Sequence, residues 1–402
     1  MKFIHFADAH LDSPFRGLSF LPSNAFNEIH QAANKSLENI VDFALKEKVD
    51  LVLIAGDTFD SNSPSPKSQL FFAEQIKKLT DAQIQVVMIF GNHDHMSKED
   101  LLVESNPYFD LLGNGEHVQR VSHVTESGFK YNVTGFSYLN NHIEKDKISE
   151  FPARDALYNF GLMHAGQKSG EKSQNVYAPF SLEKIKSLNY DYFALGHIHL
   201  RQILSENPWI VYPGNIQGRQ IGELGIKGCY FGEINELTKK TNITFIPTSP
   251  ILWDKVDLEI KGALSKQDLL IKIGDQINKK ISQKTYISLN VLGAEFLTQE
   301  ESQLLEDSDI WLAISKKLKF GSMLVDVRFK ANEFINLNET DKLAFKQAEE
   351  ETFDPIKLKQ LVSDWAKKDS LAQRLLEDPE FIAELKNQTE VKLISYLKGF
   401  EE

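Results

Sequence analysis

The sequence contains a single cysteine, Cys229, so it can form neither an intrachain disulfide nor a zinc site built from several thiolates. Cys229 lies in an apolar run that is typical of a strand, and we expect it to be a small core residue. Long apolar runs are also missing, and Met1-Lys2 leads directly into a short apolar run without a signal-peptide pattern. We therefore expect a cytoplasmic protein that does not bind membranes.

An excess of positive charge is absent as well. The formal net charge of -12 excludes a free-standing polycation that grips DNA by charge alone. It does not exclude DNA as a substrate, because a metal site needs local carboxylates and a partner subunit can supply basic surface. At 402 residues, the chain exceeds one ordinary hydrophobic core, so two or three domains are expected.

The first half of the chain alternates short apolar runs with amphipathic stretches, which is the pattern of a layered α/β domain. Helices are predicted over residues 25–46 and from Pro66 onward. Strands are predicted at 3–6, 51–54, 86–90, 131–136, 158–163, 191–195, 200–204, 209–212, 227–234 and 241–247.

Pro247 and Pro250 mark a predicted domain boundary. The pattern after it predicts a compact second α/β unit, and from about residue 330 the chain becomes polar and helical. The elements predicted in the second unit are strands at 253–260, 285–292 and 322–329 and helices at 265–280 and 298–317. We accordingly predict three parts, over residues 1–250, 251–330 and 331–402.

Five apolar runs each lead into a segment that begins with a metal-type ligand. The residues concerned are Asp8 and His10, then Asp57, then Asn92 with His93 and Asp94, then His164, and finally His197 and His199. Side chains at strand ends of an open α/β sheet converge on one edge, so we expect these residues to meet. Glycines precede Asp57, Asn92 and His197, where the backbone must leave the strand abruptly.

The ligand types indicate a catalytic metal site. Carboxylate, imidazole and amide groups without thiolate suit Mn²⁺, Fe²⁺ or Zn²⁺. Seven ligands are enough for two ions if one carboxylate bridges them, and two ions about 3.5–4 Å apart can clamp an in-line displacement at phosphorus. Each piece occurs by chance, but the full ordered set is hard to obtain without a site.

These motifs resemble the ordered motifs of calcineurin-like metallophosphoesterases. Within that superfamily, the segments 7–12, 56–60 and 212–219 are similar to those of the SbcD and YhaO type of DNA-repair exonuclease. The catalytic motifs span residues 8–199, and the resemblance to this branch extends to about residue 235. It implies an α/β fold with a four-layer β-sandwich flanked by helices, a small α/β capping domain and a helical C-terminal region.

The resemblance also implies how the ligands are divided. One ion would be held by Asp8, His10, Asp57 and His199, and the other by Asp57, Asn92, His164 and His197. Asp57 would bridge two divalent ions, for which we expect Mn²⁺ with Fe²⁺ and Zn²⁺ as alternatives, and a bridging water would be the nucleophile.

Four further residues near the motifs receive predicted roles. The position of His93 implies that it protonates the leaving oxygen or stabilises charge on the phosphate, and Asp94 either holds its imidazole or caps a loop. Asp60 either orients a ligand or caps a turn. Arg219 follows a glycine-rich turn, from which it either reaches substrate phosphate or forms a salt bridge.

The C-terminal part carries two apolar stripes. They consist of Leu358, Leu361, Val362 and Trp365, and of Val391, Ile394, Leu397 and Phe400. Such stripes pack on the same chain or dock a partner helix. The resemblance implies docking on the coiled-coil base of an ABC-type, SMC-like ATPase. A homodimer is a further expectation.

The leading functional hypothesis is a metal-dependent DNA exonuclease or endonuclease in DNA repair. The alternative is a phosphodiesterase or phosphatase of the same superfamily that acts on small molecules. Protein phosphatase activity is disfavoured, because those relatives carry arginine after the second-motif aspartate and glutamate at the end of the third motif, where this chain has Thr58 and Asp94. A non-enzymatic scaffold is disfavoured because none of the seven ligands is missing.

Overall fold

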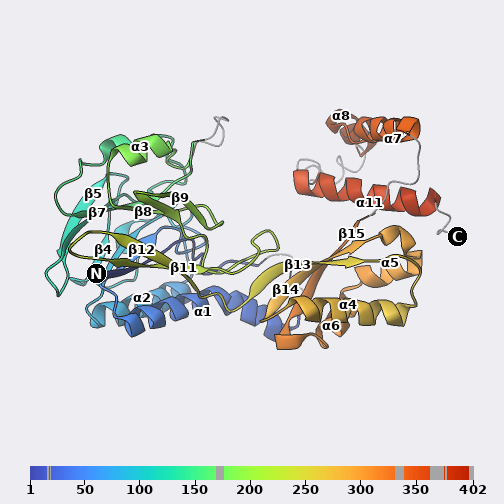
Figure 1. The fold of residues 1–402 in the computed structure, drawn as a ribbon, viewed down its shortest axis with the longest axis horizontal. Coiled ribbons are helices and arrows are strands. Elements are labelled where there is room, and N and C mark those ends of the chain that lie inside the picture. Colours follow the sequence, from blue (N-terminus) through green and yellow to red (C-terminus); the bar gives the residue numbers. More distant parts are fainter. Residues whose placement is uncertain are drawn as a thin grey trace. The chain divides into compact units, whose positions relative to one another are not determined.

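The computed structural model describes residues 1–15, 18, 20–168, 176–330, 339–362, 375 and 378–397. The chain divides into two compact units, Met1–Leu252 and Trp253–Glu402 (Figure 1). The predicted boundary near residue 250 lies beside this division, while a separate third part over 331–402 stays a prediction. Within the described ranges, no helix is both long and apolar enough to cross a membrane.

The first unit contains a six-stranded sheet in the order β12-β11-β1-β2-β3-β4. Four strands run parallel, and two antiparallel strands extend the sheet on the β1 side. The bounds are Lys2–Phe6 for β1, Leu51–Ala55 for β2, Gln85–Ile89 for β3, Phe109–Leu111 for β4, Gly228–Ile234 for β11 and Thr241–Pro247 for β12. The continuous apolar runs of β1, β2 and β3 fit a sheet that is covered on both faces.

A second six-stranded sheet has the order β5-β6-β7-β8-β10-β9. Its four central strands are parallel, and β5 and β9 are antiparallel edges. The bounds are Gln119–Val124 for β5, Lys130–Gly135 for β6, Tyr158–His164 for β7, Tyr192–Gly196 for β8, Gln202–Glu206 for β9 and Trp209–Tyr212 for β10.

The two sheets form the inner layers of a four-layer sandwich. Phe3 on β1 packs edge-on against Phe160 and Tyr192 of the second sheet, with ring centroids 5.2 and 4.9 Å apart. Its neighbour Ile4 points to the other face, where it joins the core beneath the helices, because successive side chains in a strand alternate. The predicted four-layer α/β fold is therefore confirmed.

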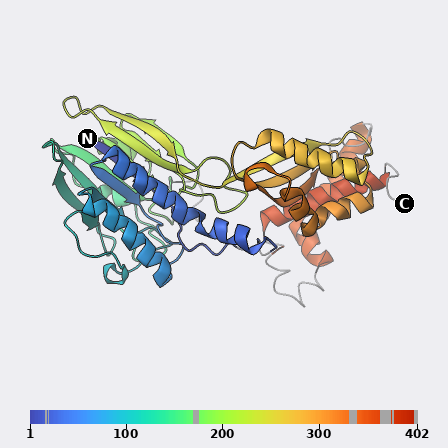
Figure 2. The ribbon, with the colours of Figure 1, turned by 90° about the horizontal axis from the view of Figure 1, so that it is seen from below.

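Helices form the outer layers. On the first sheet lie α1 (Ser23–Glu47) and α2 (Pro66–Asp81), which bury Ile40 and Phe72 in the outer core of that sheet (Figure 2). The short helix α3 (Leu182–Ser187) lies over the outer face of the second sheet. Both long helices were predicted from their apolar spacing; α3, β4 and β5 were not predicted.

The second unit is built on a three-stranded sheet in the order β13-β14-β15, with α4, α5 and α6 packed against it. The bounds are Leu252–Glu259 for β13, Lys266–Lys280 for α4, Thr285–Leu292 for β14, Gln299–Glu306 for α5, Ser308–Ser315 for α6 and Met323–Lys330 for β15. The single helix predicted over 298–317 is wrong. Asp307 has extended backbone angles, ends α5, and caps α6 by accepting from the Asp309 N–H at 2.8 Å.

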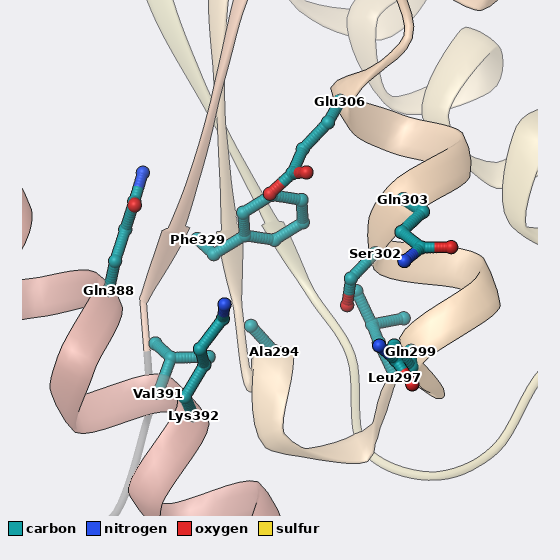
Figure 3. A pocket seen from close by; sticks show the side chains of 10 residues that line it. All are labelled: Ala294, Leu297, Gln299, Ser302, Gln303, Glu306, Phe329, Gln388, Val391 and Lys392. Carbon is teal, nitrogen blue, oxygen red and sulfur yellow. The ribbon is translucent and has the colours of Figure 1, made fainter. Parts of the chain in front are cut away.

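Among the described C-terminal residues, helices are formed by α7 (Glu339–Thr352), α8 (Pro355–Leu361) and α11 (Pro379–Leu397). The Asn387 side-chain amide donates to the Phe329 carbonyl at 2.7 Å and so fixes α11 to β15. Beside this contact, Phe329 and Val391 line a pocket of about 180 Å³ together with polar side chains of α5 (Figure 3).

Part of the two predicted apolar stripes can be located in this region. Leu358 is buried and Val391 packs on the core of the second unit, which fits packing on the same chain. Trp365 and Phe400 lie outside the described residues, as do the side chains of Leu361, Ile394 and Leu397.

The contact between α7 and α11 predicts a pH-dependent stability. Partial burial and the adjacent Glu349 carboxylate raise the pKa of Glu390 from its ordinary 4.5 to about 7. The folded state therefore keeps a proton that the unfolded chain releases, so stability falls as pH rises from about 4.5 to 7. Replacing Glu390 by Gln should raise the melting temperature at pH 8 by about 1–2 °C and leave it unchanged at pH 4.

Differential scanning calorimetry at both pH values checks this expectation. Glu350→Gln, which changes an exposed carboxylate on α7 next to Glu349, is the matched control and should not alter the melting temperature at either pH. An equal gain for both variants, or a gain for Glu390→Gln that persists at pH 4, would contradict a shared proton between the two carboxylates.

Candidate metal centre

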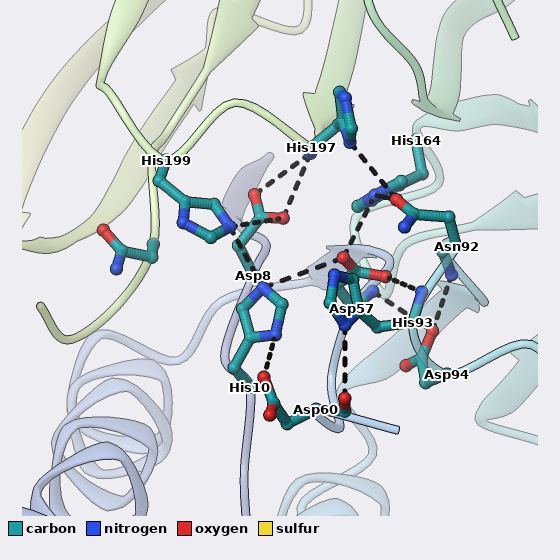
Figure 4. A network of polar contacts seen from close by, with 12 residues as sticks. Asp8, His10, Asp57, Asp60, Asn92, His93, Asp94, His164, His197 and His199 are labelled. Carbon is teal, nitrogen blue, oxygen red and sulfur yellow. Dashed lines mark hydrogen bonds and ion pairs between the residues drawn. The ribbon is translucent and has the colours of Figure 1, made fainter. Parts of the chain in front are cut away.

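The predicted ligands come together where five parallel strands of the two sheets end. Strands β1, β2 and β3 of the first sheet lead to Asp8, Asp57 and Asn92, and β7 and β8 of the second sheet lead to His164 and His197. Figure 4 shows these side chains turned toward one another, with His10 and His199 beside them. The structure thus brings all seven residues to one place, as expected from strand ends at a common edge.

Backbone pairing continues beyond the strands and holds the loops in register. The Asp8 N–H donates to the Gly56 carbonyl at 3.1 Å, and the His10 N–H donates to the Asp57 carbonyl at 3.0 Å. Asp8, His10 and Asp57 have φ values of 52°, 43° and 50°, in the left-handed region that side-chain-bearing residues seldom adopt. Such backbone costs roughly 1–3 kcal/mol per residue, and it persists here because the surrounding hydrogen bonds fix it.

Gly91 and Gly196 stand where the backbone approaches the ligands closely. A Cβ on Gly91 would lie 2.2 Å from an Asp57 carboxylate oxygen, and one on Gly196 would lie 2.0 Å from the Ala55 carbonyl oxygen. Neither position has room for a side chain. The glycines predicted to serve as turn residues therefore also make room for Asp57 and for the end of β2.

One ligand group consists of Asp8, His10 and His199. The Nε2 atoms of His10 and His199 lie 3.0 Å apart, and His199 Nε2 lies 3.9 Å from an Asp8 oxygen. Both oxygens of Asp8 also accept the backbone N–H of His197 at 3.1 Å. Asp8 and His10 are almost completely buried, so their lone pairs have little access to bulk water.

The second group consists of Asp57, His164, Asn92 and His197. Asn92 Oδ1 lies 3.1 Å from His164 Nε2 and 3.2 Å from His197 Nδ1. Asp57 Oδ2 lies 3.3 Å from His164 Nε2 and 3.7 Å from His10 Nε2. Asp57 therefore contacts both groups, which is the position that a bridging ligand requires.

The orientation of the imidazoles fits a bound cation. Asp60 and Glu223 are carboxylates that can only accept, so the Nδ1 atoms of His10 and His199 carry the protons and both Nε2 lone pairs face each other. Two lone pairs at 3.0 Å repel unless a positive species lies between them. A cation also satisfies the oxygens of Asp8 and Asp57, which a single proton cannot do.

The electrostatics of the cluster agree with this conclusion. Burial opposes protonation of His164, yet the Asp57 charge and hydrogen bond raise its pKa to about 9. Burial likewise opposes ionisation of Asp57, yet the neighbouring histidines hold its pKa far below the ordinary range. Burial and the His164 charge lower the pKa of His197 to about 3, and burial lowers the pKa of His10, so these two imidazoles stay neutral and keep a lone pair. Neutral imidazoles beside ionised carboxylates are suitable ligands for divalent ions.

His93 lies beside the ligands: a nitrogen of its ring clusters with donor atoms of His10 and Asp60, and it is not part of the Asp8, Asp57 and His164 group. Its side chain is exposed, its backbone N–H donates to Asp57 Oδ1 at 2.9 Å, and its Nδ1 lies 3.2 Å from the Asp60 carbonyl oxygen. A carbonyl oxygen accepts, so Nδ1 carries a proton and Nε2 is directed elsewhere. This arrangement suits a group that gives or takes a proton at Nε2.

Asp94 does not hold the His93 imidazole, which corrects the first of its two predicted roles. Its carboxylate is completely buried and accepts backbone N–H groups of Gly91 at 2.7 Å and Thr58 at 2.7 Å, with a weaker contact to Asp57 N–H at 3.2 Å. Asp94 therefore joins the loop after β3 to the loop after β2. Burial and the nearby Asp57 charge raise its pKa to about 7.

A second layer of polar residues surrounds the ligands. Asp60 accepts from His10 Nδ1, and Asp12 accepts the Ser65 N–H at 2.9 Å near the start of α2, so the first orients a ligand and the second caps a turn. Arg219 forms ion pairs with Asp60 and Glu223, as one of its two predicted roles required. Glu223 belongs to no recognised motif and was not predicted.

Comparison with known proteins agrees with this geometry. The family model of calcineurin-like phosphoesterases matches residues 1–214. The chain is 34% identical over 281 residues to the uncharacterized metallophosphoesterase YhaO of Bacillus subtilis strain 168, covering 69% of this chain and 68% of that protein.

Two further similarities are more distant. One is 23% identity over 210 residues with the DNA double-strand break repair protein Mre11 of Sulfurisphaera tokodaii, which covers 50% of each chain. A solved dimetal phosphatase from Danio rerio is 12% identical, with a TM-score of 0.38 over 59% of this chain and 93% of that one. On the strength of the family model and the YhaO match, the chain belongs to the calcineurin-like phosphoesterases.

Proposed function

We propose that this phosphoesterase is a metal-dependent DNA phosphodiesterase, an exonuclease or endonuclease that acts in DNA repair. The observation that carries the proposal is the position of Asp57 Oδ2, 3.7 Å from His10 in one ligand group and 3.3 Å from His164 in the other, with the exposed imidazole of His93 nearby. Such a site is suited to displacement at phosphorus with protonation of the leaving oxygen.

Calcineurin-like phosphoesterases use two divalent metal ions, and the donor set of this chain fits them. Asp8, His10 and His199 with Asp57 would hold one ion, and Asn92, His164 and His197 with Asp57 would hold the other. When bound, the ions supply Lewis-acid activation of water and of the phosphate. We propose Mn²⁺ as the physiological ion, with Fe²⁺ and Zn²⁺ as alternatives that suit the same imidazole, carboxylate and amide donors.

His93 is the proton carrier in this proposal. The Asp60 carbonyl fixes its Nδ1, and the edge-on contact of its ring with the His10 ring, 4.9 Å between centroids, fixes its plane. The protonated Nε2 then donates to the oxygen that leaves phosphorus. Because His93 is exposed, it can recover its proton from solvent after each turnover.

DNA is proposed as the substrate on two grounds. The first is the similarity to Mre11, a DNA double-strand break repair protein, which covers half of this chain. The second is that Thr58 and Asp94 stand where protein phosphatases of this superfamily carry arginine and glutamate, which disfavours that activity. A small-molecule phosphodiesterase or phosphatase of the same superfamily is the alternative.

The negative net charge means that this chain alone offers little electrostatic attraction to DNA. We therefore propose an ABC-type, SMC-like ATPase as a partner that supplies further DNA contacts. Docking through the C-terminal helices is supported by exposed apolar side chains there, Leu343 on α7 at 69% and Ile356 on α8 at 70% exposure. A pull-down experiment tests this proposal. The wild-type chain should retain a candidate ATPase, and a double variant that carries Leu343→Asp and Ile356→Asp should not.

Replacing His93 by alanine should lower phosphodiester hydrolysis by about 10²–10⁴-fold, because the leaving oxygen loses its proton donor. Metal content and DNA binding should stay at wild-type levels, since the His93 ring is exposed and lies outside the two ligand groups. Steady-state cleavage of end-labelled DNA, metal analysis and a DNA-binding titration measure the three properties.

His117→Ala is the control for this change, because His117 is an exposed histidine without contact to the motifs. Its cleavage rate should equal that of the wild type. Retained cleavage by His93→Ala protein of verified metal content would contradict the role assigned to His93.

The substrate class predicts a preference among test compounds. With Mn²⁺, the enzyme should hydrolyse bis(p-nitrophenyl) phosphate in preference to p-nitrophenyl phosphate and should degrade end-labelled DNA, and removal of metal by EDTA should stop all three reactions. Cleavage of the diester without any cleavage of single- or double-stranded DNA, in the presence and absence of a candidate ATPase, would favour the small-molecule alternative.

A further inference from the structure

Two of the proposed metal ligands are each backed by a carboxylate. His10 Nδ1 donates to Asp60 Oδ1 at 3.0 Å, and His199 Nδ1 donates to Glu223 Oε1 at 2.7 Å. In both cases the opposite ring nitrogen, Nε2, faces the metal centre. A carboxylate behind an imidazole fixes its tautomer and its orientation and makes its lone pair more basic.

Arg219 connects these two carboxylates. One terminal guanidinium nitrogen binds Asp60 Oδ1, and the other lies 3.7 Å from Glu223 Oε1. The backbone N–H of Arg219 donates to Glu223 Oε2 at 2.7 Å. Its positive charge is therefore shared between two anions. These ion pairs explain a partly buried arginine at this position without a contact to substrate phosphate.

Glu223 is held so completely that even an isosteric change would disturb it. Its Oε2 accepts from the Asn215 amide at 2.7 Å as well as from the Arg219 backbone, and the side chain is only 9% exposed. A glutamine would place an NH₂ group either against the His199 Nδ1–H or against two other donors. Neither orientation satisfies all partners, and a buried donor that faces a donor is costly.

The other ligand group has a different support. His164 Nδ1 donates to the Ala55 backbone carbonyl at 2.9 Å, and the His197 ring packs on Tyr177 with 4.5 Å between centroids. In the described part of the chain, neither histidine has a carboxylate behind it of the kind that backs His10 and His199. The two halves of the centre thus differ in the charge placed behind their imidazoles.

We propose that Asp60, Arg219 and Glu223 form a positioning clamp that makes the Asp8–His10–His199 half of the centre the tighter metal site. The three residues come from the loop after β2 and from the segment between β10 and β11, so the clamp fixes His10 and His199 from separate parts of the chain. The inference rests on the metal ligands of the proposed function and is independent of DNA as the substrate.

Titration of the full-length protein with Mn²⁺ by isothermal calorimetry tests the clamp. The wild type should bind two ions with unequal affinity. Glu223→Gln should weaken the tighter site by about 10–100-fold and leave the second dissociation constant unchanged. Asp60→Asn removes the carboxylate behind His10 and should weaken the same site. It serves as a second variant in case Glu223→Gln does not fold.

Electron paramagnetic resonance gives a readout that a general loss of stability would not produce. At two equivalents of Mn²⁺, the wild type should show a spin-coupled pair of ions, and both variants should show mononuclear Mn²⁺ although their circular dichroism spectra show folded protein. Arg219→Lys should give an intermediate loss of affinity, because a lysine ammonium cannot bind both carboxylates at once.

Asp110→Asn is the matched control. It removes a carboxylate 3.0 Å from a histidine, His123, that lies outside the metal centre, and it should leave both Mn²⁺ affinities unchanged. Equal weakening of both sites in Glu223→Gln, or wild-type affinity at both, would overturn the proposed clamp. A wild-type protein that binds two ions but cleaves no DNA would reject the proposed substrate and leave the clamp intact.

Discussion

The structure of the first unit depends on the burial of negative charge at Asp57. Its side chain is 2% exposed and lies among imidazoles from both sheets, where an unbalanced charge would be too costly to keep. The histidines supply positive charge or accept a cation, and they do so only if five strand ends meet within a few ångströms. The sandwich architecture is therefore linked to the chemistry of the site, because the charge of Asp57 is balanced by side chains that come from both sheets.

The loops that deliver the ligands are held by hydrogen bonds that substitute for regular structure. Asp94 binds the backbone of two loops, and the pairing of Asp8 and His10 with residues 56 and 57 extends the first sheet past its last regular residue. These bonds compensate the left-handed backbone of Asp8, His10 and Asp57. A rigid frame of this kind keeps the ligands at fixed distances before any ion binds.

Much of this arrangement could be predicted from the sequence, because continuous apolar runs mark the central parallel strands and each is followed directly by its ligand. The runs at 51–54 and 158–163 correspond closely to β2 and β7. Strand β5 was missed because Arg120, Ser122 and His123 interrupt its apolar pattern. The break at Asp307 was missed because apolar residues continue at helical spacing on both sides of it.

The supporting residues were harder to foresee than the ligands. Asp94 has the same sequence context whether it binds the imidazole beside it or backbone groups of another loop, so only the folded positions decide between the two. Glu223 lies in a segment without a recognisable pattern, and its contact with His199 depends on the path of the chain after β10. Interactions between distant loops leave no periodic signal in a sequence.

The division of the ligands between the two sheets has a mechanical consequence. Asp8, His10, Asp57 and Asn92 follow strands of the first sheet, while His164, His197 and His199 belong to the second. Each ion of the proposed pair would thus have ligands from both sheets and would act as a cross-link across the sandwich. Separation of the sheets would require release of the ions. Metal binding would therefore raise the free energy of unfolding of this unit, and loss of the metal would lower it.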